Sequence, residues 1–179
     1  MSKGREKGAR YERRIARKLS LWASEGKSGV WYSRRPFSGG AQRHKEGATG
    51  QAGDIYADMA EAYWFTNNFA VECKFYTQMP VLLWRYFSDG QGLLNSFIQQ
   101  ASEAANTISA YWMLIMKGNH RNDIVFTDYE QIKHLIVNCY TLSYNNSNGK
   151  SNNIVIFDLE QLFKVQPDKL KHLLEAKEK

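Results

Sequence analysis

The chain has 179 residues and a mass of 20.7 kDa, and we expect a single domain over residues 1–179. Its 43% apolar and 13% aromatic residues are enough to bury a core, which excludes a largely disordered chain. The sequence has no apolar run near the ~18 residues of a membrane helix and no apolar stretch behind its basic N-terminus, so we expect neither a membrane span nor a secretory signal. Two cysteines without CxxC spacing exclude a disulfide scaffold and a zinc ribbon. We therefore expect an intracellular, cytoplasmic protein.

The net charge of +6 is unevenly distributed along the chain. Residues 1–50 carry 13 Lys and Arg against 4 Asp and Glu, a net charge of +9, whereas the other 129 residues carry 11 against 14, a net charge of −3. A basic segment attached to a mildly acidic body favours a polyanionic partner, most simply nucleic acid. A basic tail that only keeps the protein soluble is the open alternative.

The first part of the chain predicts a helix followed by three strands. Residues 3–8 are expected to be loosely held, and apolar residues at helical spacing predict a helix from Ala9 that ends at Gly26. The three strands are expected at residues 30–35, 54–58 and 69–76. A loop containing five glycines, residues 38–53, precedes the second strand, and a turn at Asn67-Asn68 precedes the third.

The rest of the chain predicts a second long helix, further strands and short helices. An apolar stripe of helical period predicts a helix over residues 91–109. Strands are expected at residues 111–116, 124–126 and 154–157, and the last two are each followed by a short helix that begins at an Asp. A Ser- and Asn-rich loop is expected at residues 144–153, and a charged final helix at residues 168–179. The order of elements indicates an α/β fold.

A carboxylate and an ammonium group share one face of the strand predicted at residues 69–76. Because side chains alternate along a strand, Glu72 and Lys74 lie about 7 Å apart on the same face, and the opposite face is apolar. Asp54 opens the preceding strand 18 residues earlier, and a hairpin would bring the two carboxylates together. Two oxygen ligands with water are what Mg²⁺ or Mn²⁺ requires. An ordinary strand with a solvated Glu–Lys face stays open, and Asp58 is expected to be solvated.

Glu12 adds a third acid. Ile15, Ala16 and Leu19 follow it at helical spacing, which places Glu12 on the apolar face of the first helix. A carboxylate that points towards a core needs a partner, a hydrogen bond or a metal. Two interpretations remain open: Glu12 faces the acidic site, or it lies at the edge of the stripe, where it reaches solvent or pairs with an Arg.

These motifs resemble the PD-(D/E)xK nuclease superfamily, and within it the Holliday-junction-resolvase-like and the phage or restriction-type endonucleases. The residues that carry the resemblance are Glu12, Asp54 in Gly53-Asp54-Ile55, and Glu72 and Lys74 in Val71-Glu72-Cys73-Lys74. The predicted order of helix, three strands, helix and strand over about residues 8–117 is similar to the core of that superfamily. The resemblance implies a restriction-endonuclease-like α/β core with a mixed central sheet flanked by helices, and residues 118–179 form a C-terminal extension.

The resemblance also implies roles for individual residues. Asp54, Glu72 and the main-chain carbonyl of Cys73 would hold Mg²⁺, for which Mn²⁺ would substitute. Lys74 would orient the attacking water or stabilise charge on the phosphate, and Glu12 would support the site through a metal-bound water. Gln100 matches a glutamine found on the second helix of many relatives, and Ser38 lies in a small polar segment similar to one that these resolvases place before the catalytic Asp.

The basic segment is expected to bind DNA through phosphate contacts, which give affinity but little sequence choice. The candidate residues are Arg10, Arg13 and Arg14 on the first helix and Arg34, Arg35, Arg43 and Lys45 around the glycine loop.

We therefore expect a Mg²⁺-dependent deoxyribonuclease that hydrolyses phosphodiester bonds, including those of branched or junction DNA. It is expected to be phage-encoded in a bacterial host and to act as a homodimer, because cutting two strands needs two sites. Two other functions stay open: an inactive nucleic-acid-binding module on a nuclease fold, and a phage structural or assembly protein with a basic arm. The second of these predicts no metal dependence.

Overall fold

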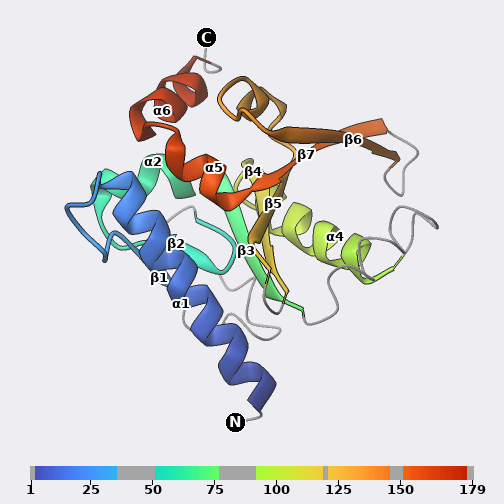
Figure 1. Ribbon diagram of the computed structural model, residues 1–179, viewed down its shortest axis with the longest axis horizontal. Helices are drawn as coiled ribbons and strands as arrows, with labels where there is room; N and C mark the ends of the chain where they lie inside the picture. The colour runs from blue at the N-terminus through green and yellow to red at the C-terminus, as the bar shows by residue number, and fades with distance from the viewer. Residues whose placement is uncertain (1–2, 36–50, 77–91, 119–120, 146–150, 177–179) are drawn as a thin grey trace.

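The structure is a computed structural model that describes residues 3–35, 51–76, 92–118, 121–145 and 151–176 (Figure 1). The elements up to the second long helix are α1 (Lys3–Ala23), β1 (Tyr32–Arg34), β2 (Ile55–Ala57), η2 (Ala60–Ala62), α2 (Tyr63–Thr66), β3 (Phe69–Phe75) and α4 (Leu93–Asn106). Those that follow are β4 (Tyr111–Lys117), β5 (Asp123–Thr127), η3 (Glu130–His134), β6 (Cys139–Asn145), β7 (Ser151–Asp158), α5 (Leu159–Lys164) and α6 (Pro167–Glu175). The predicted order of helix, three strands, helix and strand is confirmed, with η2 and α2 inserted before β3.

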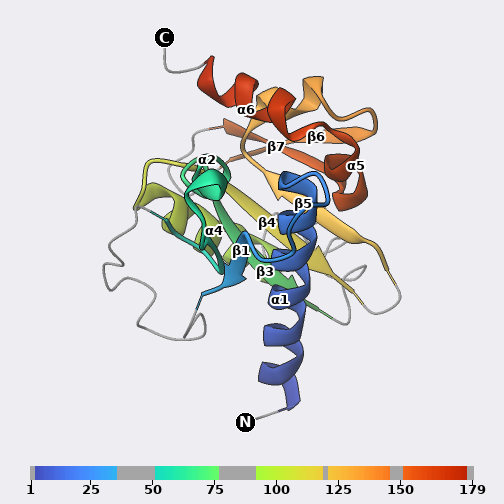
Figure 2. The same ribbon diagram turned by 90° about the vertical axis from the view of Figure 1, so that its left-hand side faces the viewer.

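The described residues form a five-stranded sheet and a separate two-stranded one. The larger sheet has the strand order β3-β4-β5-β7-β6, in which β3 and β4 are parallel and the remaining pairs are antiparallel. The smaller sheet is the antiparallel pair of β1 and β2. In Figure 1 the strands β3–β5 stand between α1 and α4, and Figure 2 shows α1 lying along one face of the sheet. The expected α/β architecture with a mixed sheet flanked by helices is therefore confirmed.

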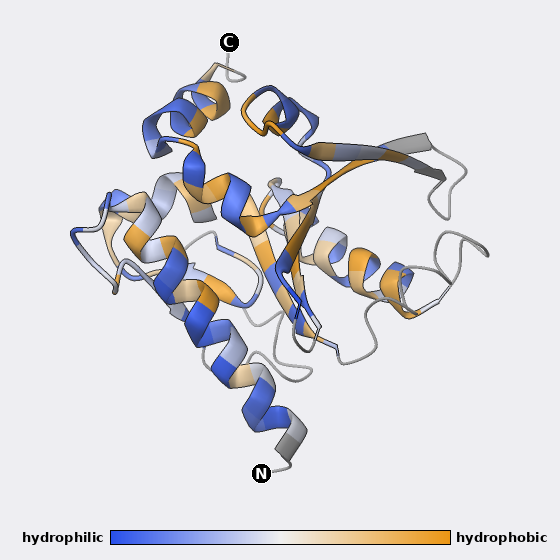
Figure 3. Ribbon diagram, in the orientation of Figure 1, coloured by the Kyte–Doolittle hydropathy of each residue, from blue (hydrophilic) through white to orange (hydrophobic). Residues whose placement is uncertain are grey.

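Alternation along β3 explains why each face of the sheet carries a helix. Val71 and Cys73 point into a buried cluster that includes Ile15 and Leu19 of α1. Ala70 points into a second buried cluster, which includes Ile98 of α4. Figure 3 shows hydrophobic colour along the central strands and hydrophilic colour along much of α1. The strand is therefore buried on both faces, and its polar residues are held in place by packing.

Two expectations about local structure are wrong. Residues 3–8 were expected to be loosely held, but α1 begins at Lys3 and gains an i,i+4 ion pair between Glu6 and Arg10. Residues 144–153 were expected to be a loop, but β6 extends to Asn145 and β7 begins at Ser151, so only the residues between these strands lie outside the described structure. The alternation of Tyr140 and Leu142 with small polar residues is the signal that could have identified β6.

The expected hairpin between the strands of Asp54 and Glu72 is also wrong. β2 pairs with β1, and η2 and α2 separate it from β3. The two segments instead meet at a parallel bridge between Gly53 and Val71. The carboxylates are thus brought together by a crossover of the chain, because the residues between the strands fold as helices.

No helix in the described ranges is both long and apolar enough to cross a membrane.

Candidate metal and catalytic centre

Asp54 is held against β3 by its own backbone and side chain. Its N–H donates to the carbonyl of Val71 at 2.7 Å, and its Oδ2 accepts a hydrogen bond from the N–H of Cys73 at 3.0 Å. Gly53 permits this approach, because a Cβ at that position would lie 2.5 Å from the carbonyl oxygen of Val71. Asp54 is only 2% exposed. The aspartate is therefore fixed beside the peptide that joins Glu72 to Cys73.

Glu72 and Lys74 share one face of β3, as their spacing predicts, and this face packs against α4. Glu72 is 2% exposed, and its Oε2 lies 3.1 Å from Nζ of Lys74. The same ammonium group lies 5.6 Å from the ring centroid of Phe97 on α4, which is a cation–π contact. The interpretation of Glu72 and Lys74 as an ordinary solvated pair is therefore excluded by their burial.

Glu12 is buried on α1 and forms an ion pair with Nε of Arg34 on β1. Glu12 thus pairs with an Arg, as the second of the two interpretations expects, and its role at the acidic site stays a prediction. Arg34, expected to be a phosphate contact, has a carboxylate partner in the protein itself.

The three carboxylates act on one thiol. Burial raises the pKa of Cys73 well above its usual value, and the charges of Asp54, Glu12 and Glu72 raise it further, while Lys74 lowers it. The thiol is therefore protonated at neutral pH, which makes it a poor metal ligand. The hydrogen bond of Asp54 with the N–H of Cys73 and the place of Glu72 on β3 put these two acids at the same segment of the strand.

The residues of this centre fit a hard divalent cation with few protein ligands. The described residues contain no group of three His, Cys, Asp or Glu side chains placed to enclose a metal. Mg²⁺, however, usually keeps several waters and takes only one or two carboxylates from the protein. Asp54 and Glu72 are two such carboxylates on adjoining segments, and both are buried. The donor set is thus oxygen-rich and matches Mg²⁺ or Mn²⁺ better than a metal that prefers sulfur or imidazole.

Gln100 is half-buried on α4, as are its neighbours Phe97 and Ala104 on the same flank of the helix. Gln99 is exposed and donates from Nε2 to Oε1 of Glu103 at 3.0 Å. Gln100 is therefore the less exposed of the two glutamines, and a role for it in the reaction stays a prediction.

The basic residues predicted to bind DNA divide into two groups. Arg10 and Arg13 are exposed, whereas Arg14 forms an ion pair with Asp123 at 2.7 Å. Arg35 donates from Nη2 to the carbonyl of Gln51. Three further candidates, Ser38, Arg43 and Lys45, lie outside the described residues.

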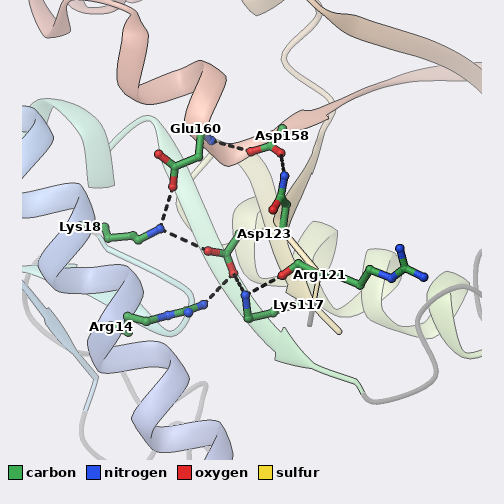
Figure 4. A network of polar contacts seen from close by, with 8 residues as sticks. Arg14, Lys18, Lys117, Arg121, Asp123, Asp158 and Glu160 are labelled. Carbon is green, nitrogen blue, oxygen red and sulfur yellow. Dashed lines mark hydrogen bonds and ion pairs between the residues drawn. The ribbon is translucent and has the colours of Figure 1, made fainter. Parts of the chain in front are cut away.

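Asp123 is a buried acid at the start of β5 that sequence reasoning missed (Figure 4). Its carboxylate accepts contacts from Arg14 at 2.7 Å, from Lys18 at 3.5 Å and from Lys117 at 3.8 Å. Lys18 also pairs with Glu160 of α5 at 2.8 Å. These residues join α1 to the sheet and to α5. No local pattern marks Asp123, because its partners on α1 are more than 100 residues away in the sequence.

The chain matches the profile of the protein family described as phage putative PDDEXK endonuclease over residues 3–172. No curated protein and no solved structure matches it. The matched region extends well past the core expected at residues 8–117, so the strands β5, β6 and β7 belong to the family region as well. The fold is accordingly the restriction-endonuclease-like α/β fold, and the chain belongs to the family of phage PDDEXK endonucleases.

Proposed function

We propose that this nuclease is a Mg²⁺-dependent DNA endonuclease whose metal site is formed by Asp54, Glu72 and the main-chain carbonyl of Cys73. The observation that carries the proposal is the contact of the buried Asp54 carboxylate with the N–H of Cys73, directly beside buried Glu72. A protein that only binds nucleic acid has no use for two buried carboxylates in this arrangement, since negative charge repels phosphate.

The residues around the metal site each have a role in phosphodiester hydrolysis. A bound divalent cation would lower the pKa of a water and act as a Lewis acid towards the phosphate. Lys74, held beside Glu72, places a fixed positive charge where charge develops on the phosphate oxygens. Glu12 lies on the α1 side of the same segment and supports the site through solvent.

The partner is DNA, and the substrates to test include branched and junction DNA. The net charge of +9 over residues 1–50 supports binding to a polyanion. Two copies acting together would cut both strands, since each chain supplies one pair of acids. Such a phage nuclease would act in the cytoplasm of a bacterial host, where its DNA substrate is found.

The test is a cleavage assay with labelled duplex, single-stranded, flap and four-way-junction DNA in Mg²⁺, Mn²⁺ or chelator. The expected result is cleavage in either metal and none in chelator, with Glu72→Gln inactive but still folded and still able to bind DNA. Glu130→Gln, which removes a half-exposed carboxylate on η3, is the charge-matched control and should cleave normally. Full activity of Glu72→Gln, or cleavage in chelator, would overturn the assignment.

A further inference from the structure

Arg34 connects the two elements that supply Glu12 and Asp54. Arg34, the last residue of β1, is opposite Ile55 of β2. The N–H of the following residue, Arg35, donates to the carbonyl of Asp54 at 2.8 Å. The side chain of Arg34 leaves this strand and pairs through Nε with the Oε2 of Glu12. The backbone of the Arg34 strand is therefore tied to Asp54, while its side chain is tied to α1.

The pair is well shielded from solvent. The side chain of Arg34 is 25% exposed and that of Glu12 is 12% exposed. An arginine in a partly buried ion pair has a fixed geometry, because its planar guanidinium group donates in defined directions. Buried charged groups in proteins are normally paired. Arg34 therefore fixes the position of Glu12.

Arg34 also adds a cation beside one of the acids near β3. The three acids Glu12, Asp54 and Glu72 are all buried. Lys74 compensates Glu72, and Arg34 compensates Glu12 from the opposite side of the strand. A site with three acids and two cations keeps one net negative charge, which favours a divalent cation without repelling the DNA strongly.

We infer that Arg34 is a positioning residue that acts through Glu12 and does not serve as a phosphate contact. The kinetic part of this inference rests on the proposed function, whereas the coupling between Arg34 and Glu12 does not. A phosphate contact would lower DNA affinity and its salt dependence when removed. Removal of a positioning residue lowers the rate at saturating DNA and leaves the DNA affinity and its salt dependence unchanged.

The kinetic test compares Arg34→Gln, Arg34→Lys, Glu12→Gln and the Arg34→Gln/Glu12→Gln double variant at saturating DNA and Mg²⁺. We expect Arg34→Gln to lower kcat about 10–100-fold, the range typical of residues that orient a metal site from outside it, with little change in KM. Arg34→Lys should recover part of the loss because it keeps the charge. The double variant should be no slower than Glu12→Gln alone, since the side chain of Arg34 acts through the carboxylate of Glu12. The control, Lys164→Gln, removes an exposed positive charge on α5 and should behave as wild type.

Two kinetic results would overturn the inference. An unchanged kcat with a salt slope of DNA binding lowered by about one would make Arg34 a phosphate contact. A double variant slower than Glu12→Gln by the full Arg34→Gln factor would show that Arg34 does not act through Glu12.

The coupling can be measured without any cleavage. Urea unfolding of the same four variants should give a midpoint shift for the double variant that is clearly smaller than the sum of the two single shifts. Additive shifts would refute the pairing whatever the activity. If the wild type cleaves no substrate but the shifts are non-additive, the proposed function fails and the pairing of Arg34 with Glu12 stands. The two failures are thus distinguishable.

Discussion

Gly53 is the residue on which the position of Asp54 depends most directly. Its φ angle is +89°, a conformation that residues with a Cβ rarely adopt. A Cβ at this position would also lie 2.5 Å from the carbonyl oxygen and 2.7 Å from the nitrogen of Val71. Both atoms belong to the backbone of the central strand β3, so neither can move aside without disturbing the sheet. The close approach of the Asp54 segment to β3 therefore requires glycine.

Gly53→Ala should accordingly be much more damaging than the same change at a glycine with open surroundings. Gly26 is the matched control, since its φ angle is +83° but no atom lies within 4 Å of its added Cβ. We expect Gly26→Ala to destabilise the protein by about 1–2 kcal/mol of backbone strain. Gly53→Ala should lower the free energy of unfolding by about 2 kcal/mol more than Gly26→Ala, because of the overlap with Val71. It should also bind Mn²⁺ more weakly. Urea unfolding measures the first effect and calorimetry the second. Equal losses in the two variants would show that the approach to Val71 is not tight.

At the residue scale, Asp54, Glu72 and Lys74 could be selected from the sequence, whereas the particular partner of Glu12 and the buried acid Asp123 could not. The alternation of β3 and the position of Asp54 after a glycine were sufficient to select Glu72, Lys74 and Asp54. The ion pair of Arg34 with Glu12 joins residues of different elements, and no spacing rule connects them. Helical periodicity placed Glu12 on the apolar face but left open what it meets there.

The helix α1 carries its basic residues on two sides with different partners. Arg14 and Lys18, four residues apart, face the sheet and contact Asp123. Arg10, Arg13 and Arg17 lie on the side that is exposed to solvent. Helix geometry explains the division, because at about 100° per residue Arg10, Arg13 and Arg17 fall within about 60° of one another, and Arg14 and Lys18 lie further round towards the sheet. The exposed row, Arg10, Arg13 and Arg17, is therefore a part of α1 that is available to a DNA backbone.

Replacing the exposed row with Gln should lower the salt dependence of DNA binding. If all three side chains neutralise phosphates of a duplex, the slope of log affinity against log salt should fall by roughly 2.7. The control replaces three exposed lysines at the C-terminal end of the chain, Lys164, Lys169 and Lys171, and should leave the slope unchanged. The measurement is a fluorescence anisotropy titration in Ca²⁺ at several salt concentrations. A slope equally lowered by both triple variants would mean that only the overall charge matters and that α1 does not contact DNA.

The inward side of α1 is predicted to stabilise the fold. Asp123→Asn removes the charge that Arg14, Lys18 and Lys117 share, and the carboxylate is 5% exposed. Loss of one member of a buried ionic cluster destabilises a protein strongly. Because these three cations are 22–40% exposed, we expect the free energy of unfolding to fall by only about 2 kcal/mol. The half-exposed pair of Glu130 and Lys133 is the control, and Glu130→Gln should change stability by less than about 0.5 kcal/mol. Similar effects of the two changes in thermal unfolding would contradict the role of Asp123.

At the element scale, periodicity predicted the type and order of the long elements but not how they pair. The apolar stripes of α1 and α4 and the apolar runs of β3 and β4 are strong signals. The hairpin expected between β2 and β3 was wrong, because the aromatic segment between them folds as η2 and α2. Such short apolar segments carry too few residues for a period to be recognised. Pairing is decided by contacts between distant residues, such as the bridge of Gly53 with Val71.

The whole molecule combines two units around one strand. The two-stranded sheet of β1 and β2 carries Arg34, and Asp54 directly precedes β2. The five-stranded sheet carries Glu72 and Lys74 on β3. The crossing of these units at the Gly53–Val71 bridge assembles the acidic centre, and α1 covers it from one face with Glu12. Residues beyond 117 complete the sheet through β5, β7 and β6, and α5 contacts α1 through Lys18. The segment expected to be an extension is therefore part of the framework that holds α1.

The most direct test of this account is the position of a bound metal ion. Crystals soaked in Mn²⁺ should show an anomalous peak in contact with the carboxylates of Asp54 and Glu72 and with the carbonyl oxygen of Cys73, at the 2.0–2.3 Å expected for oxygen ligands of such ions. The peak should be absent from crystals of Asp54→Asn soaked in the same way. A crystal without a peak at these residues, or one with Mn²⁺ bound elsewhere and unaffected by the substitution, would contradict the proposed metal-dependent nuclease centre.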